Sequence, residues 1–247
     1  LPKDLPAPAP TFSVVIDGSY IYALVIGKER ENLFKLRLSD GQTVWAASID
    51  KYVQGVPLVL YDGKLLVRSR VSPWPRDAHG YFQAVNPENG GVLWRVRIEG
   101  TSGATDELPL IASDRAYLTS EASSPETTHL YTIDLRQGRV LDHQVMHQID
   151  SAFAEHQGIL YFGGDKPAAF DVIRKQILWQ AHLTYPQGVG INVPKRPLLD
   201  PIREEIYLGE WEQDLYVLSS RTGQVKEKVY IRGYWRGEFF SPLKAFF

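Results

Sequence analysis

The chain has 247 residues, 44% of them hydrophobic, so it can bury a substantial core without disulfides or metals. Its 27 basic and 29 acidic residues form no basic cluster, which argues against nucleic-acid binding, and no apolar run is long enough to cross a bilayer. Cysteine is absent, which excludes disulfides, thiolate catalysis and cysteine-bound metals.

Residues 1–11 hold four prolines and predict an extended linker. The sequence starts at Leu1 with neither an initiator methionine nor a hydrophobic signal segment, which indicates a processed, engineered or partial form.

From residue 12 onward, short strand-like segments follow one another in groups of four. In the second group, segments 56–61, 64–68, 81–85 and 92–98 are rich in β-branched and aromatic residues and are bounded by Gly, Asp and Asn. The same order recurs in five units, 12–49, 56–98, 108–146, 151–183 and 197–231. No segment has sustained helical periodicity. We therefore expect an all-β fold of four-stranded antiparallel blades.

Each unit carries a turn at the same phase, before its last strand. The slot that marks this turn holds glycine in four units and lysine in one: Gly41, Gly90, Gly138, Lys175 and Gly223. Four residues later stand Trp45, Trp94, Asp142, Trp179 and Glu227. The slots lie 49, 48, 37 and 48 residues apart. A period in this range in strand-like sequence is typical of a propeller or solenoid, because one unit alone cannot bury its apolar face.

The turns resemble the PQQ-like, or tryptophan-docking, β-propeller repeat, which reads roughly Ala-x-Asp-x-x-Thr-Gly-x-x-x-Trp. The alanine slot holds Ala84 and Ala169, the aspartate slot holds Asp134 and Asp171, and 221–223 reads Arg-Thr-Gly. The resemblance covers nearly everything after residue 11. It implies that Trp45, Trp94 and Trp179 pack against the neighbouring blade, and that units three and five pack differently.

The resemblance also bears on function. Quinone-dependent dehydrogenases of this family hold their cofactor with a cysteine disulfide and use an eight-bladed ring, whereas this chain has no cysteine and is shorter. It looks more like the non-catalytic branch, which includes the propeller lipoprotein of outer-membrane barrel assembly. That likeness implies no cofactor, a protein or carbohydrate partner, and a periplasmic, cell-surface or secreted location, with a cytoplasmic one left open.

Strand direction predicts which face binds a partner. Strands one and two of each blade are joined tightly, and so are strands three and four, so both turns must lie on one face. The longer, more varied loops emerge on the opposite, loop-rich face, where binding residues usually lie. Aromatic and charged residues there are candidate contacts: Trp74, Arg76, Asp77, His79, Trp211, Tyr234, Trp235 and Arg236. The alternative is that these side chains only cap their blades.

The sequence predicts no catalytic set and no metal site. Its alternative function is a glycoside hydrolase or lyase using Asp106, Glu107 and Asp150 at the channel mouth. His143 and His147 have the spacing of a helical metal pair, but the segment reads as a strand, where a metal would need other ligands.

We expect residues 12–247 to form a single propeller domain. The tail, 239–247, resembles the first strand of a sixth unit, so the chain is either an unusual ring closure or part of a longer propeller.

Overall fold

The computed structural model describes residues 12–25, 32–49, 58–70, 79–100, 109–121, 127–147, 149, 153–164, 166–183, 196–209 and 214–230. Across these ranges every regular element is a strand, and the strands form five four-stranded antiparallel sheets. The predicted all-β architecture is therefore confirmed. The tail 239–247 lies outside the described residues.

Strands pair in chain order within each sheet, so each sheet is an up-and-down meander. The strands are β1 (Phe12–Asp17), β2 (Tyr20–Val25), β3 (Leu33–Arg37) and β4 (Thr43–Ala47); β5 (Val59–Tyr61), β6 (Lys64–Arg70), β7 (His79–Val85) and β8 (Val92–Glu99); β9 (Leu110–Ala112), β10 (Arg115–Glu121), β11 (Thr127–Asp134) and β12 (Arg139–His147); β13 (Phe153–His156), β14 (Ile159–Phe162), β15 (Ala168–Asp171) and β16 (Gln176–Gln180); β17 (Leu198–Asp200), β18 (Glu205–Gly209), β19 (Asp214–Ser219) and β20 (Val225–Tyr230).

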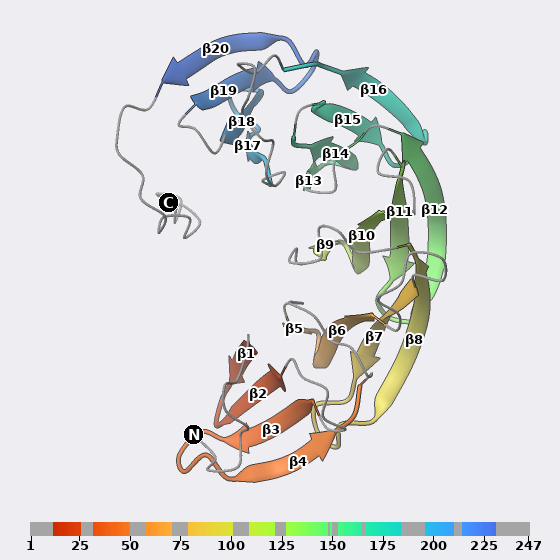
Figure 1. Cartoon of the computed structure of the whole chain (residues 1–247), viewed down its shortest axis with the longest axis vertical. Helices are drawn as coiled ribbons and strands as arrows, with labels where there is room; N and C mark the ends of the chain where they lie inside the picture. The colour runs from red at the N-terminus through yellow and green to blue at the C-terminus, as the bar shows by residue number, and fades with distance from the viewer. Residues whose placement is uncertain are drawn as a thin grey trace.

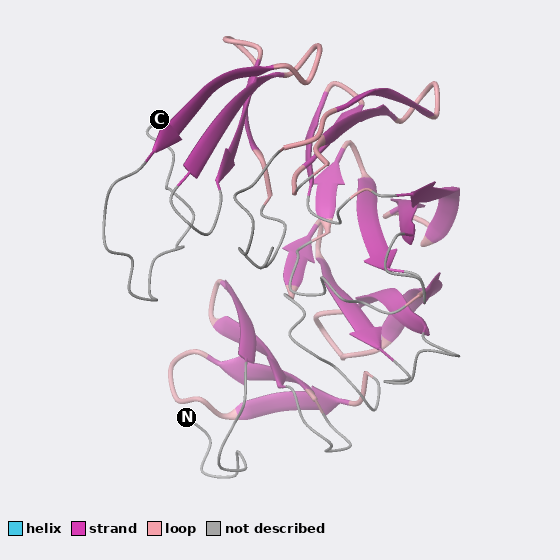
Figure 2. Ribbon diagram, turned by 45° about the horizontal axis from the view of Figure 1, so that its top comes forward, coloured by secondary structure: helices cyan, strands magenta, loops and turns pink. Residues whose placement is uncertain are grey.

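The five sheets, called blades one to five in chain order, follow one another along an arc (Figure 1). The first strand of each blade lies on the concave side of the arc, and the fourth lies on the convex side. Blades one and five stand at the two ends. Figure 2 shows the described residues to be strands joined by turns.

Buried side chains gather between blades rather than within them. Four hydrophobic clusters each draw on two consecutive blades, so every seam of the arc has its own core. In the seam between blades two and three, for example, Phe82 and Leu66 pack with Leu118 and Ile133. This layout follows from the repeat, since a single meander has two apolar faces and needs a neighbour on each.

The repeat turn has the same geometry in all five blades. The strand pairing shifts by one residue, a β-bulge, at the same place in every blade, for example between Ala84 and Val85. All five slot residues have positive φ, and Lys175 adopts it at +56° although it is not glycine. Carboxylates close the turn where the aspartate slot is filled: Asp134 accepts the backbone N–H groups of Arg136 and Gln137. The repeat predicted from the sequence is therefore a real structural unit.

Each docking tryptophan covers the slot residue of the following blade. A Cβ added to Gly138 would lie 2.3 Å from ring atoms of Trp94, one added to Gly223 the same distance from Trp179, and one added to Gly90 2.9 Å from Trp45. Only glycine leaves room for a ring that close. The predicted inter-blade packing of the three indoles is thus confirmed.

The tryptophans are half-buried rather than fully buried. They lie on β4, β8 and β16, the fourth strands of their blades, and each remains partly exposed. Trp45 Nε1 donates to Pro87 O at 3.0 Å, and Trp179 Nε1 donates to Ser220 O at 2.8 Å, both in the next blade. Trp94 Nε1 is buried and has no hydrogen-bond partner in the described part of the chain.

An ion pair replaces the tryptophan and glycine in the seam between blades three and four. Asp142 stands in the tryptophan slot of blade three, and its carboxylate lies 2.6 Å from Nζ of Lys175, the slot residue of blade four. Burial alone would raise the pKa of Asp142, but hydrogen bonds from Lys175 and Gln144 lower it below its ordinary value. The two departures from the repeat are thus partners of each other.

We predict that the seam between blades three and four also accepts a tryptophan and a glycine, the two residues that the repeat has at these slots. Asp142→Trp alone sets an indole against the Lys175 side chain and should destabilise the fold. Adding Lys175→Gly makes room for the ring and removes a non-glycine residue from positive φ. Urea unfolding of the two single variants and the double variant should give a favourable coupling of about 1–3 kcal/mol. Strictly additive effects would show that the two slots do not meet.

The wild-type pair should also give a small pH dependence. Because the folded pKa of Asp142 is lowered, the contribution of the pair is fully present above the ordinary value of 3.8 and is lost as pH falls through the folded pKa.

Candidate partner-binding faces

Both tight turns of a blade lie on one face, which we call the turn face, as strand direction predicts. Backbone hydrogen bonds tie the two turns together in four blades: Leu38 N–H to Ser19 O, Leu135 N–H to Asp114 O, Val172 N–H to Gly158 O and Ser220 N–H to Glu204 O, at 2.8–3.0 Å. In Figure 2 the turns of blade five lie together at one end of its strands. The turn face is therefore built of short, mutually braced segments.

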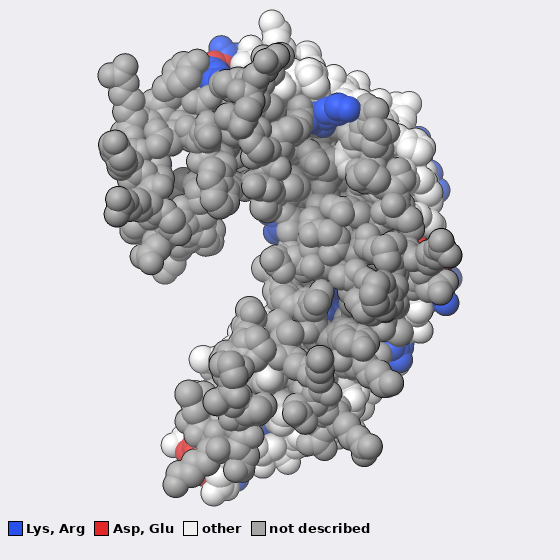
Figure 3. Space-filling view, viewed as in Figure 1, with Lys and Arg blue, Asp and Glu red and all other residues white. Residues whose placement is uncertain are grey.

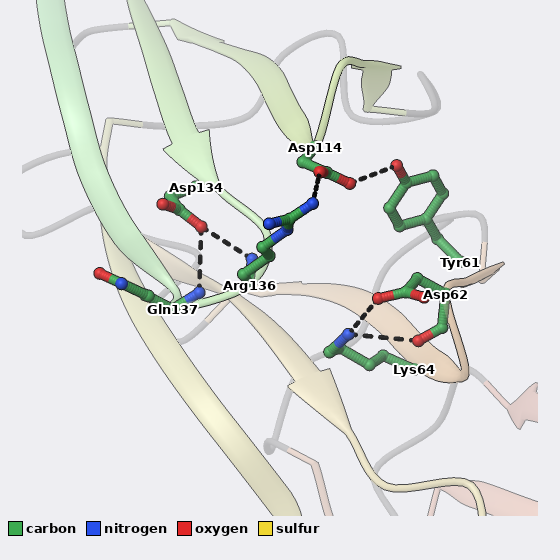
Figure 4. A network of polar contacts seen from close by, with 7 residues as sticks. All are labelled: Tyr61, Asp62, Lys64, Asp114, Asp134, Arg136 and Gln137. Carbon is green, nitrogen blue, oxygen red and sulfur yellow. Dashed lines mark hydrogen bonds and ion pairs between the residues drawn. The ribbon is translucent and has the colours of Figure 1, made fainter.

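A network of polar side chains covers the turn face between blades two and three (Figure 4). The Tyr61 hydroxyl donates to Asp114 Oδ1 at 3.0 Å, and Arg136 forms an ion pair with the other oxygen of the same carboxylate. Beside it, Lys64 Nζ lies 2.8 Å from Asp62 Oδ2. Tyr61 belongs to blade two and Asp114 to blade three, so this network also links two blades.

The same arrangement returns in blade five, where Arg221 pairs with Glu204. Arg136 and Arg221 both stand two residues before the slot glycine, and each meets an acidic residue in the first turn of its own blade. This pattern was not predicted, although the arginine at that offset and the acidic residue in the first turn can both be seen in the sequence.

The charges of the turn face are stabilised in their ordinary ionised forms. A hydrogen bond from Lys64 lowers the pKa of Asp62, and the backbone N–H of Gln137 lowers the pKa of Asp134. A hydrogen bond to Asp114 raises the pKa of the Tyr61 hydroxyl, which keeps it protonated. A general acid requires a raised pKa at neutral pH, whereas the pKa values of Asp62 and Asp134 are lowered. The network braces turns and pairs charges.

On the loop-rich face the structure describes one of the eight predicted contact residues. His79 begins β7, is half-buried, and meets the Tyr81 ring edge-on, with ring centroids 5.9 Å apart. The Arg95 guanidinium lies 3.4 Å from the centre of the same tyrosine ring. Outside the described residues lie the other seven, Trp74, Arg76, Asp77, Trp211, Tyr234, Trp235 and Arg236, and the three alternative carboxylates, Asp106, Glu107 and Asp150.

Metal-ligating and basic side chains were searched for in the part of the chain that the structure describes. Across the residues listed above as described, no group of three or more His, Cys, Asp or Glu side chains is arranged to hold a metal ion. In the view of Figure 3, the described Lys and Arg side chains form separate spots, mainly along the convex edge. No helix within the described ranges is long and apolar enough to span a membrane.

The repeat and its docking geometry identify the family. The family model PQQ_2, described as outer membrane protein assembly factor BamB, matches residues 29–233. The chain belongs to this family. No curated protein matches its sequence.

Solved structures share the fold. BamB from Moraxella catarrhalis is 19% identical, with a TM-score of 0.59, and the match covers 89% of this chain and 63% of that one. A europium-containing methanol dehydrogenase is 14% identical, with a TM-score of 0.62 and coverage of 88% and 50%. The quinohemoprotein alcohol dehydrogenase of Comamonas testosteroni is 10% identical, with a TM-score of 0.58 and coverage of 90% and 43%.

In each case this chain spans less than two thirds of the structure that it matches. At these identities the likeness shows the β-propeller fold alone.

Proposed function

We propose that the chain is a non-catalytic propeller scaffold that binds a protein partner outside the cytoplasm through its loop-rich face. The observation that carries this proposal is the contrast between the two faces. On the turn face, backbone hydrogen bonds brace the turns, and Asp62, Asp114 and Glu204 already have cationic partners. A partner that binds there would have to break those ion pairs and desolvate their charges. New ion pairs at an exposed surface seldom compensate for that cost.

The described edge of the loop-rich face supports the proposal. His79, Tyr81 and Arg95 form a cluster of rings and a guanidinium, and the chain leading into His79 contains Trp74 and Arg76. Such residues anchor protein partners because they offer large, rigid contact areas with a polar end. The description of the family, an outer-membrane protein assembly factor, favours a protein partner over a carbohydrate and a periplasmic location over a cytoplasmic one.

The test compares variants of the two faces. A partner is first trapped by photo-crosslinking from the loop-rich face in cells, then purified and titrated against the chain. We expect Trp74→Ala with Trp235→Ala to weaken binding at least tenfold while the melting temperature changes little, because neither residue occupies a docking slot. The matched control, Asp62→Ala with Arg221→Ala on the turn face, should bind like wild type.

Two other outcomes would contradict the proposal. If the Trp74 and Trp235 variant unfolds, those rings are core and the contact assignment fails. If the crosslinked species is a glycan that the wild-type chain shortens, and Asp106→Asn with Glu107→Gln stops the cleavage, the hydrolase or lyase alternative replaces the scaffold.

A further inference from the structure

Among the histidines of blade three, the structure pairs His143 with a residue other than the one that the sequence suggested. In a strand, residues four apart lie on the same side but about 13 Å from each other, too far to share one ion. His147 instead has its Nδ1 3.5 Å from Thr127 Oγ1. The neighbour of His143 is His129, on the adjacent strand, whose Nδ1 lies 2.8 Å from His143 Nε2.

Strand pairing explains why these two meet. Tyr131 is opposite His143 and Val145 is opposite His129, so the two histidines are diagonal neighbours on one side of the β11–β12 pair. His143 is exposed and His129 is half-buried, which leaves the pair accessible from solvent.

Tyr131 holds both imidazoles in place. Its ring stacks on His143 with centroids 4.3 Å apart and an angle of 5°, and His143 stacks in turn near His129 at 15°. Tyr131 is itself buried, and its hydroxyl accepts the backbone N–H of Glu99 from blade two at 3.0 Å. The two imidazoles are therefore positioned by a tyrosine that is itself held by a hydrogen bond between blades two and three.

The separation of the two nitrogens suits a shared ion. Two imidazole nitrogens bound to one Zn²⁺ at 2.0–2.1 Å lie about 2.8–3.4 Å apart at bond angles of about 90–110°, and the 2.8 Å between His129 and His143 lies at the short end of that range. We propose that His129 and His143 form a two-histidine site for a borderline divalent transition-metal ion such as Zn²⁺, Ni²⁺ or Cu²⁺, with water completing the coordination. The ion takes the place of the proton that the two nitrogens share, and that proton moves by way of solvent to the other nitrogen of its own ring, so that both imidazoles stay neutral and both facing nitrogens bind the ion.

The surroundings favour a neutral His129 imidazole at neutral pH. Burial lowers the pKa of His129, and the nearby His143 lowers it further, while the Glu99 carboxylate acts in the opposite direction. Glu99 is paired with Arg97, at 2.9 Å, on β8 of the neighbouring blade. Tyr131 on β11 lies against the pair, and the charge of Arg68, on β6, acts on Tyr131. Thr127 on β11 and His147 on β12 lie farther along the same two strands. Metal affinity should fall as pH falls, since protonated imidazole cannot bind an ion.

The experiment is a calorimetric titration of the full chain with CuCl₂ and with ZnCl₂ at pH 7.5, repeated at pH 5.5. Wild type should bind one equivalent, Cu²⁺ more tightly than Zn²⁺. His129→Gln and His143→Gln should each weaken binding at least tenfold, and wild type should lose a similar factor at pH 5.5. The matched control, His147→Gln, removes a histidine from the same strand and side and should bind like wild type.

A melting curve in chelator shows whether each variant is folded, and added Zn²⁺ should raise the melting temperature of wild type but not of His129→Gln. Equal binding by wild type and the variant lacking both His129 and His143 would overturn the proposal. An equal loss on His147→Gln would overturn it as well, because the ligands would then be other residues.

Discussion

Replacing Gly138 with alanine should be among the most destabilising single changes in the chain, costing about 3 kcal/mol or more. The new Cβ would lie 2.3 Å from Trp94, closer than any real contact, so the indole or the whole turn must move. The residue would also be held at a φ of +63°, which costs a non-glycine residue about 1–2 kcal/mol. Urea unfolding monitored by circular dichroism measures the loss.

Gly41 provides the matched control. It occupies the same slot at a φ of +71°, but a Cβ there meets nothing within 4 Å. Gly41→Ala should therefore show the backbone cost alone, about 1–2 kcal/mol. Equal losses at Gly41 and Gly138 would mean that the indole does not press on the turn.

Truncating Trp94 to alanine should cost about 3–5 kcal/mol, because it opens a cavity beside the core of blades two and three. In that background Gly138→Ala should cost no more than Gly41→Ala does, since the clashing ring has gone. The same unfolding measurement on the double variant tests this, and a loss equal to the sum of the two single losses would contradict it.

Replacing tryptophan with phenylalanine tests how much the indole N–H of each docking tryptophan contributes to stability. Trp94→Phe should cost less than Trp179→Phe, because Trp94 Nε1 is buried without a partner in the described residues while Trp179 Nε1 donates to Ser220 O. Removing a buried donor that has no partner costs little stability, whereas removing a donor that has a partner leaves the acceptor without its hydrogen bond.

Much of the fold could be predicted because the repeat is local. The offset from the slot glycine to Trp94 fixes a turn, a bulge and the strand after it within one hairpin, so sequence spacing was sufficient. What each slot touches is not local. Asp142 and Lys175 were both recognised as exceptions to the repeat. They are 33 residues apart in sequence and belong to different blades, so their contact is seen only once the two blades are packed together.

The histidine pair shows the same limit on a smaller scale. His129 and His143 are 14 residues apart across a hairpin whose register shifts at a bulge between Thr132 and Ile133. Without that register, the spacing of His143 and His147 was the more visible pattern. All eight predicted contacts remain a proposal, and His79, the first residue of β7, is the one that the structure describes.

The most direct test of the central claim, that partners bind the loop-rich face, is photo-crosslinking from both faces in cells. A photoreactive amino acid at position 74, 79 or 235 reports on the loop-rich face, and one at position 62, 136 or 221 on the turn face. We predict one protein adduct common to the first set and none from the second. Adducts formed from positions 62, 136 and 221, with none from 74, 79 and 235, would contradict the account.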